Sequence, residues 1–144
     1  MKRTFDYKAK KTPQHKLLLL ISLVLVSLLG IFTKVYAGPG QIWINHSAGG
    51  IAYEIFFCLF LHLAFPKIHP IKIVLSVFIA TCLIEFLQLY HPHWLQVLRS
   101  FWLGKAILGT TFNPWDFFHY LVGCIIGILW IFGIKYLSGR YEAH

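Results

Sequence analysis

Four long apolar runs constrain this chain more than any other feature. They cover residues 17–32, 51–65, 71–90 and 117–137. A helix needs about 20 residues to cross the hydrocarbon core of a membrane, so the two shorter runs must extend into flanking residues. Backbone N–H and C=O groups in lipid must bond within the segment, which makes each run a helix. The sequence therefore predicts an all-α integral membrane protein built as a four-helix bundle.

The composition agrees with a lipid environment. Hydrophobic residues make up 58% of the 144 residues and charged residues only 12%, which differs from the average of soluble domains. The length allows one domain. We expect a basic tail over 1–16 and a single transmembrane domain over 17–140, with helices at about 17–35, 50–65, 71–90 and 114–137.

The positive charges predict an orientation. Ten of the thirteen Lys and Arg residues lie in the N-terminal tail, between the second and third runs, or near the C-terminus. Positive charge is retained on the cytoplasmic side, so we expect both termini of this multi-pass protein in the cytoplasm. The net charge of +8 is then explained by the orientation of the protein in the membrane, so we expect no nucleic-acid partner. The ten residues are Lys2, Arg3, Lys8, Lys10, Lys11, Lys16, Lys67, Lys72, Lys135 and Arg140.

The first run has a second interpretation. A basic leader, an apolar core and the sequence Val35-Tyr36-Ala37 also fit a cleavable signal peptide. The leader is long, however, and Lys34 stands between the core and that site. These two features favour an uncleaved helix.

The connection over 91–116 is too long for a simple turn. Its apolar residues recur at roughly helical spacing from 94 to 108, with Gln96, Arg99 and Lys105 between them. Tryptophan is typical of the headgroup zone, and Trp94 and Trp102 lie in this stretch. We expect an interfacial or re-entrant segment between the third and fourth helices.

Polar residues gather at the end of the predicted bundle that lies opposite the termini. The second and fourth helices begin there and the third ends there, so Glu54, Glu85 and Asp116 are all expected near the outer membrane surface. An ionisable residue inside a membrane is a candidate for function by default. We predict an outward-facing polar pocket that binds a lipid headgroup or a small envelope ligand. Its candidate residues are Glu54, Glu85, Gln88, Arg99, Asp116, His119 and Tyr120.

The same residues have structural explanations. Glu85 opposes the dipole at the end of its helix, and Arg99 could answer its charge in a clamp on the connecting segment. Asn113, Pro114 and Asp116 have the spacing of the N-cap, N1 and N3 positions of a helix start, which resembles a capping box. The residues alone do not separate a binding pocket from a clamp.

Three further helix positions carry hypotheses. Gly123 and Gly127 have the spacing of close helix contacts, either within the bundle or in a dimer, and packing within the bundle is favoured. His62 could ligate a haem or another pigment, although a hydrogen-bonded core histidine is the commoner situation.

Signatures of soluble enzymes are absent from the sequence. It holds no assignable Ser/His/Asp set, phosphate-binding loop or C-x-x-C pair. Asp116 and His119 form an Asp-x-x-His pair without a second such motif, so no metal is predicted. The cofactor is unknown, and the sequence requires none. These observations favour a protein that is not an enzyme, with Cys58, Cys82 and Cys124 as apolar packing residues.

Several of these motifs resemble the DUF2809 family (domain of unknown function 2809), a family of small bacterial membrane proteins, over most of residues 17–130. The resemblance implies a bacterial membrane protein and carries no known chemistry. Where the family has Gly-Asp and an aromatic residue, this chain has Gly49-Gly50 followed by Tyr53-Glu54, so Glu54 would replace that acid. The matching residues are Gly30-Ile31-Phe32-Thr33-Lys34, Glu85, Gln88-Leu89, Trp94-Leu95, Arg99, Gly104, Leu108-Gly109, Phe112, Asp116, Tyr120 and Gly123.

Residues 82–127 are also similar to the VanZ-like family, some of whose members are linked to glycopeptide resistance. Tyr120 stands where those proteins carry Asn. Two other function classes stay open at this point. One is an accessory or structural subunit of a larger respiratory or photosynthetic complex, with other membrane subunits as partners. The other is a membrane enzyme that uses Glu85 and Asp116. Membrane lipids are expected partners in each case.

Overall fold

The computed structural model of this chain describes residues 13–138. Within that range the chain is helical, and four helical segments are long and apolar enough to cross a membrane. The predicted all-α, four-helix architecture is therefore confirmed. The segments are α1 (Pro13–Val35), a continuous run of α2 (Gln41–Trp43), the π-turn η1 (Ile44–Ala48) and α3 (Gly49–Ala64), then α4 (Pro70–Leu87) and α7 (Asp116–Leu137).

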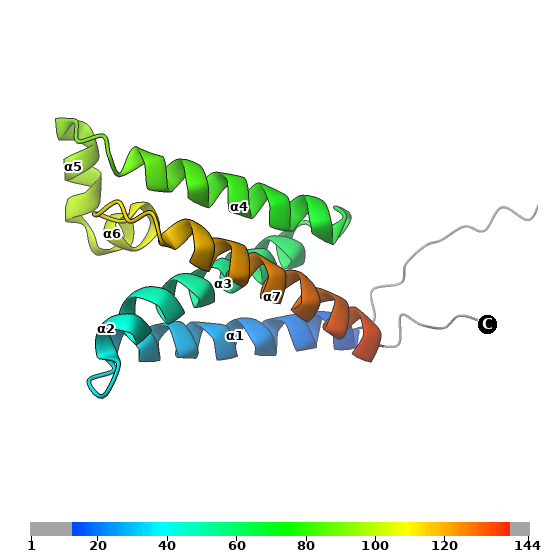
Figure 1. Ribbon diagram of the computed structural model, residues 1–144. Helices are drawn as coiled ribbons and strands as arrows, with labels where there is room; N and C mark the ends of the chain where they lie inside the picture. The colour runs from blue at the N-terminus through cyan, green and yellow to red at the C-terminus, as the bar shows by residue number, and fades with distance from the viewer. Residues whose placement is uncertain (1–12, 139–144) are drawn as a thin grey trace, which may run out of the picture.

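The long helices run back and forth along one direction (Figure 1). The start of α1, the end of α7 and the turn between α3 and α4 lie at one end, which we call the terminal end. The opposite, loop end holds residues 36–40 and the short helices α5 (His93–Ser100) and α6 (Trp102–Leu108). Lys16, Lys67, Lys72 and Lys135 belong to the terminal end, whereas Arg140 and the predicted tail over 1–12 lie outside the described residues.

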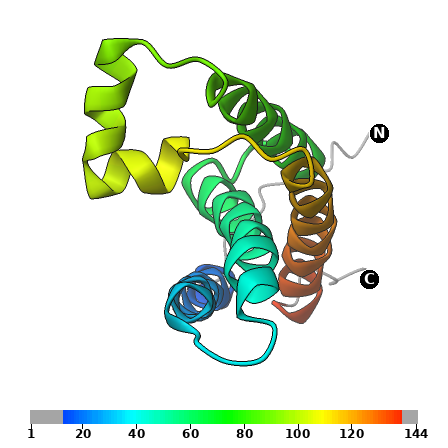
Figure 2. The ribbon, with the colours of Figure 1, turned by 60° about the vertical axis from the view of Figure 1, so that its left-hand side comes forward.

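The central helix of the bundle is α3. It packs against α1, α4 and α7 (Figure 2), and its buried residues include Cys58 and Leu59. The outer faces of the long helices are strongly apolar: Val24 on α1 is 59% exposed and Leu129 on α7 is 64% exposed. Apolar surface of this extent is unfavourable in water but is what lipid chains cover. The structure is that of a multi-pass membrane protein.

The second spanning helix begins earlier than expected. The α-helix α3 starts at Gly49, next to the predicted start at about residue 50, but the spanning run extends back through η1 and α2 to Gln41, so the two glycines lie inside it. Neighbouring helices approach both of them. A Cβ atom on Gly49 would lie 3.2 Å from Thr33 Oγ1 of α1, and one on Gly50 would lie 3.8 Å from His119 Cβ of α7. The glycines therefore serve helix contact instead of ending a loop.

The predicted helical segment between the third and fourth spans consists of α5 and α6. The helix α5 crosses the loop end beside the end of α4, and α6 turns back toward the bundle (Figure 2). The corner between them requires glycine at position 104, because a Cβ atom there would lie 1.8 Å from the Leu98 carbonyl oxygen. Tyr53 of α3 fixes α6 by donating a hydrogen bond to the Ile107 carbonyl at 3.2 Å.

Candidate functional site

Glu85 is the centre of a buried hydrogen-bond network at the loop end. Its side chain is fully buried near the end of α4. Its Oε1 atom accepts a hydrogen bond from the Asn113 backbone N–H at 2.7 Å. Its Oε2 atom accepts from Tyr120 Oη at 2.9 Å and from Gln88 Nε2 at 3.0 Å. One carboxyl group thus joins α4, the segment that precedes α7, and α7 itself.

Arg99 does not pair with Glu85, so the predicted Glu–Arg ion pair is wrong. Its Nη1 and Nη2 atoms donate to the carbonyl oxygens of Tyr90, at 3.1 Å, and Leu87, at 3.0 Å. Leu87 is the last residue of α4 and Tyr90 lies in the turn that follows, so the guanidinium fork binds one carbonyl at the helix end and one just beyond it. Arg99 is 3% exposed. It holds α5 to the end of α4, as a clamp would, but through backbone groups.

Replacing Arg99 with methionine is expected to destabilise the fold by about 2–3 kcal/mol, because two hydrogen bonds from a charged group, each contributing about 1.5–3 kcal/mol, are lost and the apolar replacement of a buried charge recovers part of that loss. Methionine keeps part of the apolar stem and removes both donors. The stability of Arg99→Lys should lie between those of the unmodified chain and Arg99→Met, since one ammonium group cannot reproduce the guanidinium fork. Thermal unfolding in detergent measures the stability of the three proteins.

The matched control for this series is Lys105→Met, which removes an exposed cation from α6 and should change stability by less than about 0.5 kcal/mol. Unchanged stability of Arg99→Met would contradict the capping role.

Asn113 and Asp116 organise the start of α7. Asn113 Oδ1 accepts from the Trp115 backbone N–H at 3.3 Å, and its Nδ2 atom donates to Asp116 Oδ1 at 2.9 Å. A capping box would direct the Asn113 N–H to Asp116, but that N–H donates to Glu85. His119 Nδ1 lies 3.6 Å from Asp116 Oδ1, and both side chains are partly exposed. The N-cap of α7 is Trp115 without a side-chain cap, so the predicted capping positions of Asn113, Pro114 and Asp116 are wrong, and Glu85 of another helix binds the turn that precedes α7.

Glu54 lies apart from this network. It stands near the middle of the 24-residue span Gln41–Ala64, deeper than the outer position that was predicted for it. Its Oε1 atom is 2.8 Å from Thr81 Oγ1 of α4 and 3.5 Å from Cys124 Sγ of α7. The two acidic residues of α3 and α4 therefore occupy different depths and different surroundings.

Gly123 and Gly127 face α3, as packing within the bundle requires. A Cβ atom on Gly123 would lie 2.5 Å from Glu54 Cβ, and one on Gly127 would lie 3.0 Å from Cys58 Cβ. The two glycines let α7 approach α3 closely at the level of Glu54.

His62 lies at the terminal end of α3, far along the chain from the polar residues of the loop end. It is 1% exposed, and its ring meets that of His15 edge-on with 5.7 Å between the centroids. His15 Nδ1 is 3.3 Å from Ser138 Oγ. Haem or pigment ligation by His62 stays a prediction. Among residues 13–138, no group of three or more His, Cys, Asp or Glu side chains has a metal-binding arrangement.

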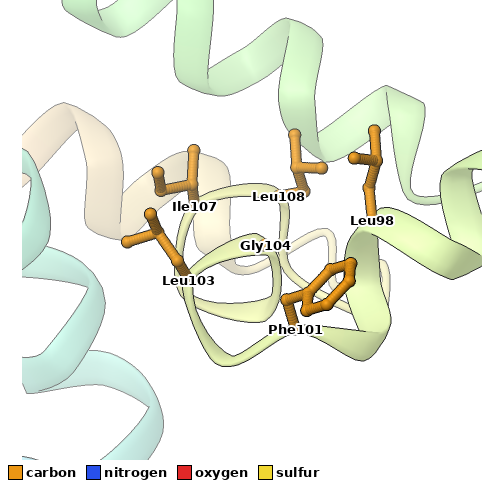
Figure 3. A pocket seen from close by; sticks show the side chains of 6 residues that line it. All are labelled: Leu98, Phe101, Leu103, Gly104, Ile107 and Leu108. Atoms are coloured by element: carbon orange, nitrogen blue, oxygen red, sulfur yellow. The ribbon is translucent and has the colours of Figure 1, made fainter.

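An apolar hollow of about 440 Å³ lies at the corner between α5 and α6 (Figure 3). None of the seven predicted polar residues lines it. Glu54, Glu85, Gln88 and Arg99 are at most 6% exposed, so within the described chain only Asp116, His119 and Tyr120 offer any surface to a polar ligand. The polar pocket itself stays a prediction. The hollow is lined by Leu98, Phe101, Leu103, Gly104, Ile107 and Leu108.

Sequence reasoning missed two residues of these networks, Thr81 and Cys124. Thr81 lies four residues before Glu85, so helical spacing places the two on one face of α4. That spacing was a usable signal. Cys124 carries no such signal, because its contact with Glu54 depends on the close approach of α7 to α3.

Comparison with known proteins gives one family. The family model described as "Protein of unknown function (DUF2809)" matches residues 40–124. The matched range contains the hydrogen-bond networks of Glu85 and Glu54, the α5–α6 corner and Gly123, but not α1. No curated protein and no solved structure matches the chain. The partial likeness to the VanZ-like family stays a prediction.

Proposed function

This chain belongs to the DUF2809 family, and we propose that it is a membrane protein that binds an anionic phospholipid at its loop end. One acyl chain would occupy the hollow between α5 and α6, and the phosphate would lie beside Lys105. The positive charges at the terminal end would orient the loop end toward the outer face. The hollow is the observation that carries this proposal.

The chemistry of the hollow fits a hydrocarbon chain. Its lining residues are aliphatic or aromatic apart from Gly104, and its volume is about 440 Å³. Ligand sites are mostly apolar concavities with a few polar groups at the rim. Lys105 is an exposed cation on the same short helix, next in sequence to the lining residue Gly104, and we assign it to the phosphate. Arg99, predicted as the anion contact, is buried and engaged with carbonyl groups.

The position of α5 and α6 also suits a lipid. Trp94, Trp102 and Trp115 are exposed by 57%, 81% and 72%, and exposed tryptophan is typical of the level of the lipid headgroups. Leu95 and Arg99 of α5 are buried while Val97 and Leu98 are exposed. A helix that crosses the end of a bundle with one face buried and the other apolar resembles an interfacial helix.

The buried polar network supports the hollow without lining it. Arg99 attaches α5 to α4, and Tyr53 attaches α6 to α3. Glu85 holds the segment that leads from α6 to α7. A binding site needs supports of this kind to keep its shape. The polar residues singled out from the sequence would thus act by positioning the two short helices.

The test measures phospholipid retained after gentle solubilisation, by native mass spectrometry of the full chain. Leu103→Trp and Ile107→Trp add bulk at the hollow, and we expect at least a tenfold loss of bound phospholipid. The control is Leu129→Trp on the outer face of α7, which should retain lipid like the unmodified chain. In vesicles of mixed headgroup charge, Lys105→Gln should lose the preference for anionic lipid.

Equal lipid retention by all three tryptophan variants would overturn the proposal. Co-purification of another membrane protein in fixed stoichiometry, with no bound lipid, would favour the accessory-subunit class instead.

A further inference from the structure

The middle of the bundle holds an acid that lipid binding does not use. Glu54 is fully buried between α3, α4 and α7. Its Oε2 atom is buried and has no hydrogen-bond partner among the described residues. No described Lys, Arg or His lies within 4.0 Å of its carboxyl group. A carboxylate without a cation near the centre of a membrane is strongly unfavourable.

Glu85 provides the internal comparison. Three donors, two of them nitrogen and one hydroxyl, surround its carboxyl group at 2.7–3.0 Å. Such donors stabilise a negative charge. Within residues 13–138, the donors to Glu54 are the Thr81 hydroxyl at 2.8 Å and the Cys124 thiol at 3.5 Å, and a thiol is a weak donor. The two acids have opposite hydrogen-bonding surroundings.

The Thr81 hydroxyl shows how a neutral Glu54 fits its site. Thr81 Oγ1 lies 3.0 Å from the carbonyl oxygen of Val77, as well as 2.8 Å from Glu54 Oε1. A hydroxyl has one hydrogen and can also accept. If Glu54 carries a proton on Oε1, it donates to Thr81, and Thr81 donates to Val77. If Glu54 is charged, the single Thr81 hydrogen must turn toward it and Oε2 still receives nothing.

We propose that Glu54 is a proton-binding site in the centre of the bundle, and that Thr81 positions the bound proton. The ligand is a single exchangeable proton. The site is independent of the proposed lipid site, because none of its residues lines the α5–α6 hollow. An acid of this kind gives the chain a group that can take up or release a proton between the two membrane surfaces.

Other titratable groups lie near the site on the helices packed against it, and His119 of α7, which approaches Gly50 one turn before Glu54, can become a cation. On the α1 side, Gly30 meets Ala52 of α3, and neither residue can ionise. Any pH response assigned to Glu54 must therefore be distinguished from the titration of the nearby thiols, phenols, His119 and Glu85. These groups are Tyr53 and Cys58 on α3, Cys82 and Glu85 on α4, and His119, Tyr120 and Cys124 on α7.

Infrared spectroscopy tests the proposal on the full chain in phospholipid vesicles at pH 7. Labelling glutamate carboxyl carbons with ¹³C isolates three residues, Glu54, Glu85 and Glu142. We expect one C=O stretching band of a neutral carboxylic acid, which shifts in D₂O because the proton exchanges. The band should be lost in Glu54→Gln and retained in Glu85→Gln.

Thr81→Val keeps the test decisive even if Glu54→Gln fails to fold. It removes the acceptor, so the neutral-acid band should move to the higher frequency of an acid without a hydrogen bond. The control is Ser76→Ala, which removes another α4 hydroxyl, one bonded to the Lys72 carbonyl, and should leave the band in place. The absence of a neutral-acid band in the unmodified chain, its loss in Glu85→Gln, or an unmoved band in Thr81→Val would each overturn the proposal.

Discussion

Gly123→Ala is expected to push α7 away from α3 and to destabilise the bundle by about 1–3 kcal/mol, the usual cost of overpacking. The added Cβ atom would lie 2.5 Å from Glu54 Cβ and 3.0 Å from the Ile51 carbonyl oxygen. Neither atom is the free end of a flexible side chain. One helix must therefore move, and the shift would disturb the Glu54 contacts with Thr81 and Cys124.

Two other glycines of α7 make this a graded series. At Gly127 the nearest atoms to an added Cβ are Cys58 Cβ at 3.0 Å and Cys58 Sγ at 3.2 Å, so Gly127→Ala should cost less than Gly123→Ala. At Gly133 an added Cβ meets nothing within 4 Å. Gly133→Ala should be neutral or slightly stabilising, because alanine favours helix by about 1 kcal/mol.

Thermal unfolding in detergent, followed by circular dichroism, measures the series. From the most to the least stable variant, the expected order is Gly133→Ala, Gly127→Ala, then Gly123→Ala. A Gly123→Ala variant as stable as Gly133→Ala would show that α3 and α7 do not approach as closely as described.

Glu85→Ala is expected to have the largest effect of any loop-end substitution, a loss of about 3–5 kcal/mol, because it removes the acceptor of three buried donors at once. The change leaves three donors without an acceptor: the Asn113 N–H, the Tyr120 hydroxyl and the Gln88 amide. Each buried donor without a partner costs about 1–3 kcal/mol. The start of α7 and the end of α4 should both loosen.

Milder variants separate the contributions. Tyr120→Phe removes one donor and should cost about 1 kcal/mol, whereas Glu85→Gln keeps one acceptor oxygen and should fall between the two. In a double-mutant cycle, Glu85→Ala and Tyr120→Phe should couple by about 0.5–3 kcal/mol. The Asn113 amide should also exchange its hydrogen faster in Glu85→Ala.

Additive energies for this pair, or unchanged exchange at Asn113, would contradict the network. Lipid retention should fall in Glu85→Ala as well, since Glu85 holds the segment behind the α5–α6 corner. That readout connects the buried acid to the proposed lipid site.

Much of the fold could be predicted because a membrane imposes it. The four apolar runs predict the four spans, and the pattern of 94–108 predicts a helical segment between the last two. The start of the second span could not be predicted in the same way. Gly49 and Gly50 are typical of a loop, yet here they let Thr33 of α1 and His119 of α7 approach the helix.

The candidate site was predicted as a set of residues but not as an arrangement. Glu85, Gln88 and Tyr120 do meet, whereas Arg99 binds carbonyl groups and Glu54 lies deeper, with Thr81 and Cys124. Charge suggests a pairing of Arg99 with Glu85. Arg99 instead donates to carbonyl groups at the C-terminal end of α4. The position of α5 across that end brings the guanidinium within reach of them.

The amino-acid sequence alone specifies the number of spanning helices and the end of the bundle at which Glu85 and Asp116 lie. These properties follow from the apolar content and the length of a segment, and lipid acts on each segment separately. The tertiary structure decided which donor each buried acid receives and where the apolar hollow forms. Hydrogen bonds act over about 3 Å, so they depend on distances between helices, which no single segment encodes. These distances give Glu85 three hydrogen-bond donors and give Glu54 a hydroxyl and a thiol.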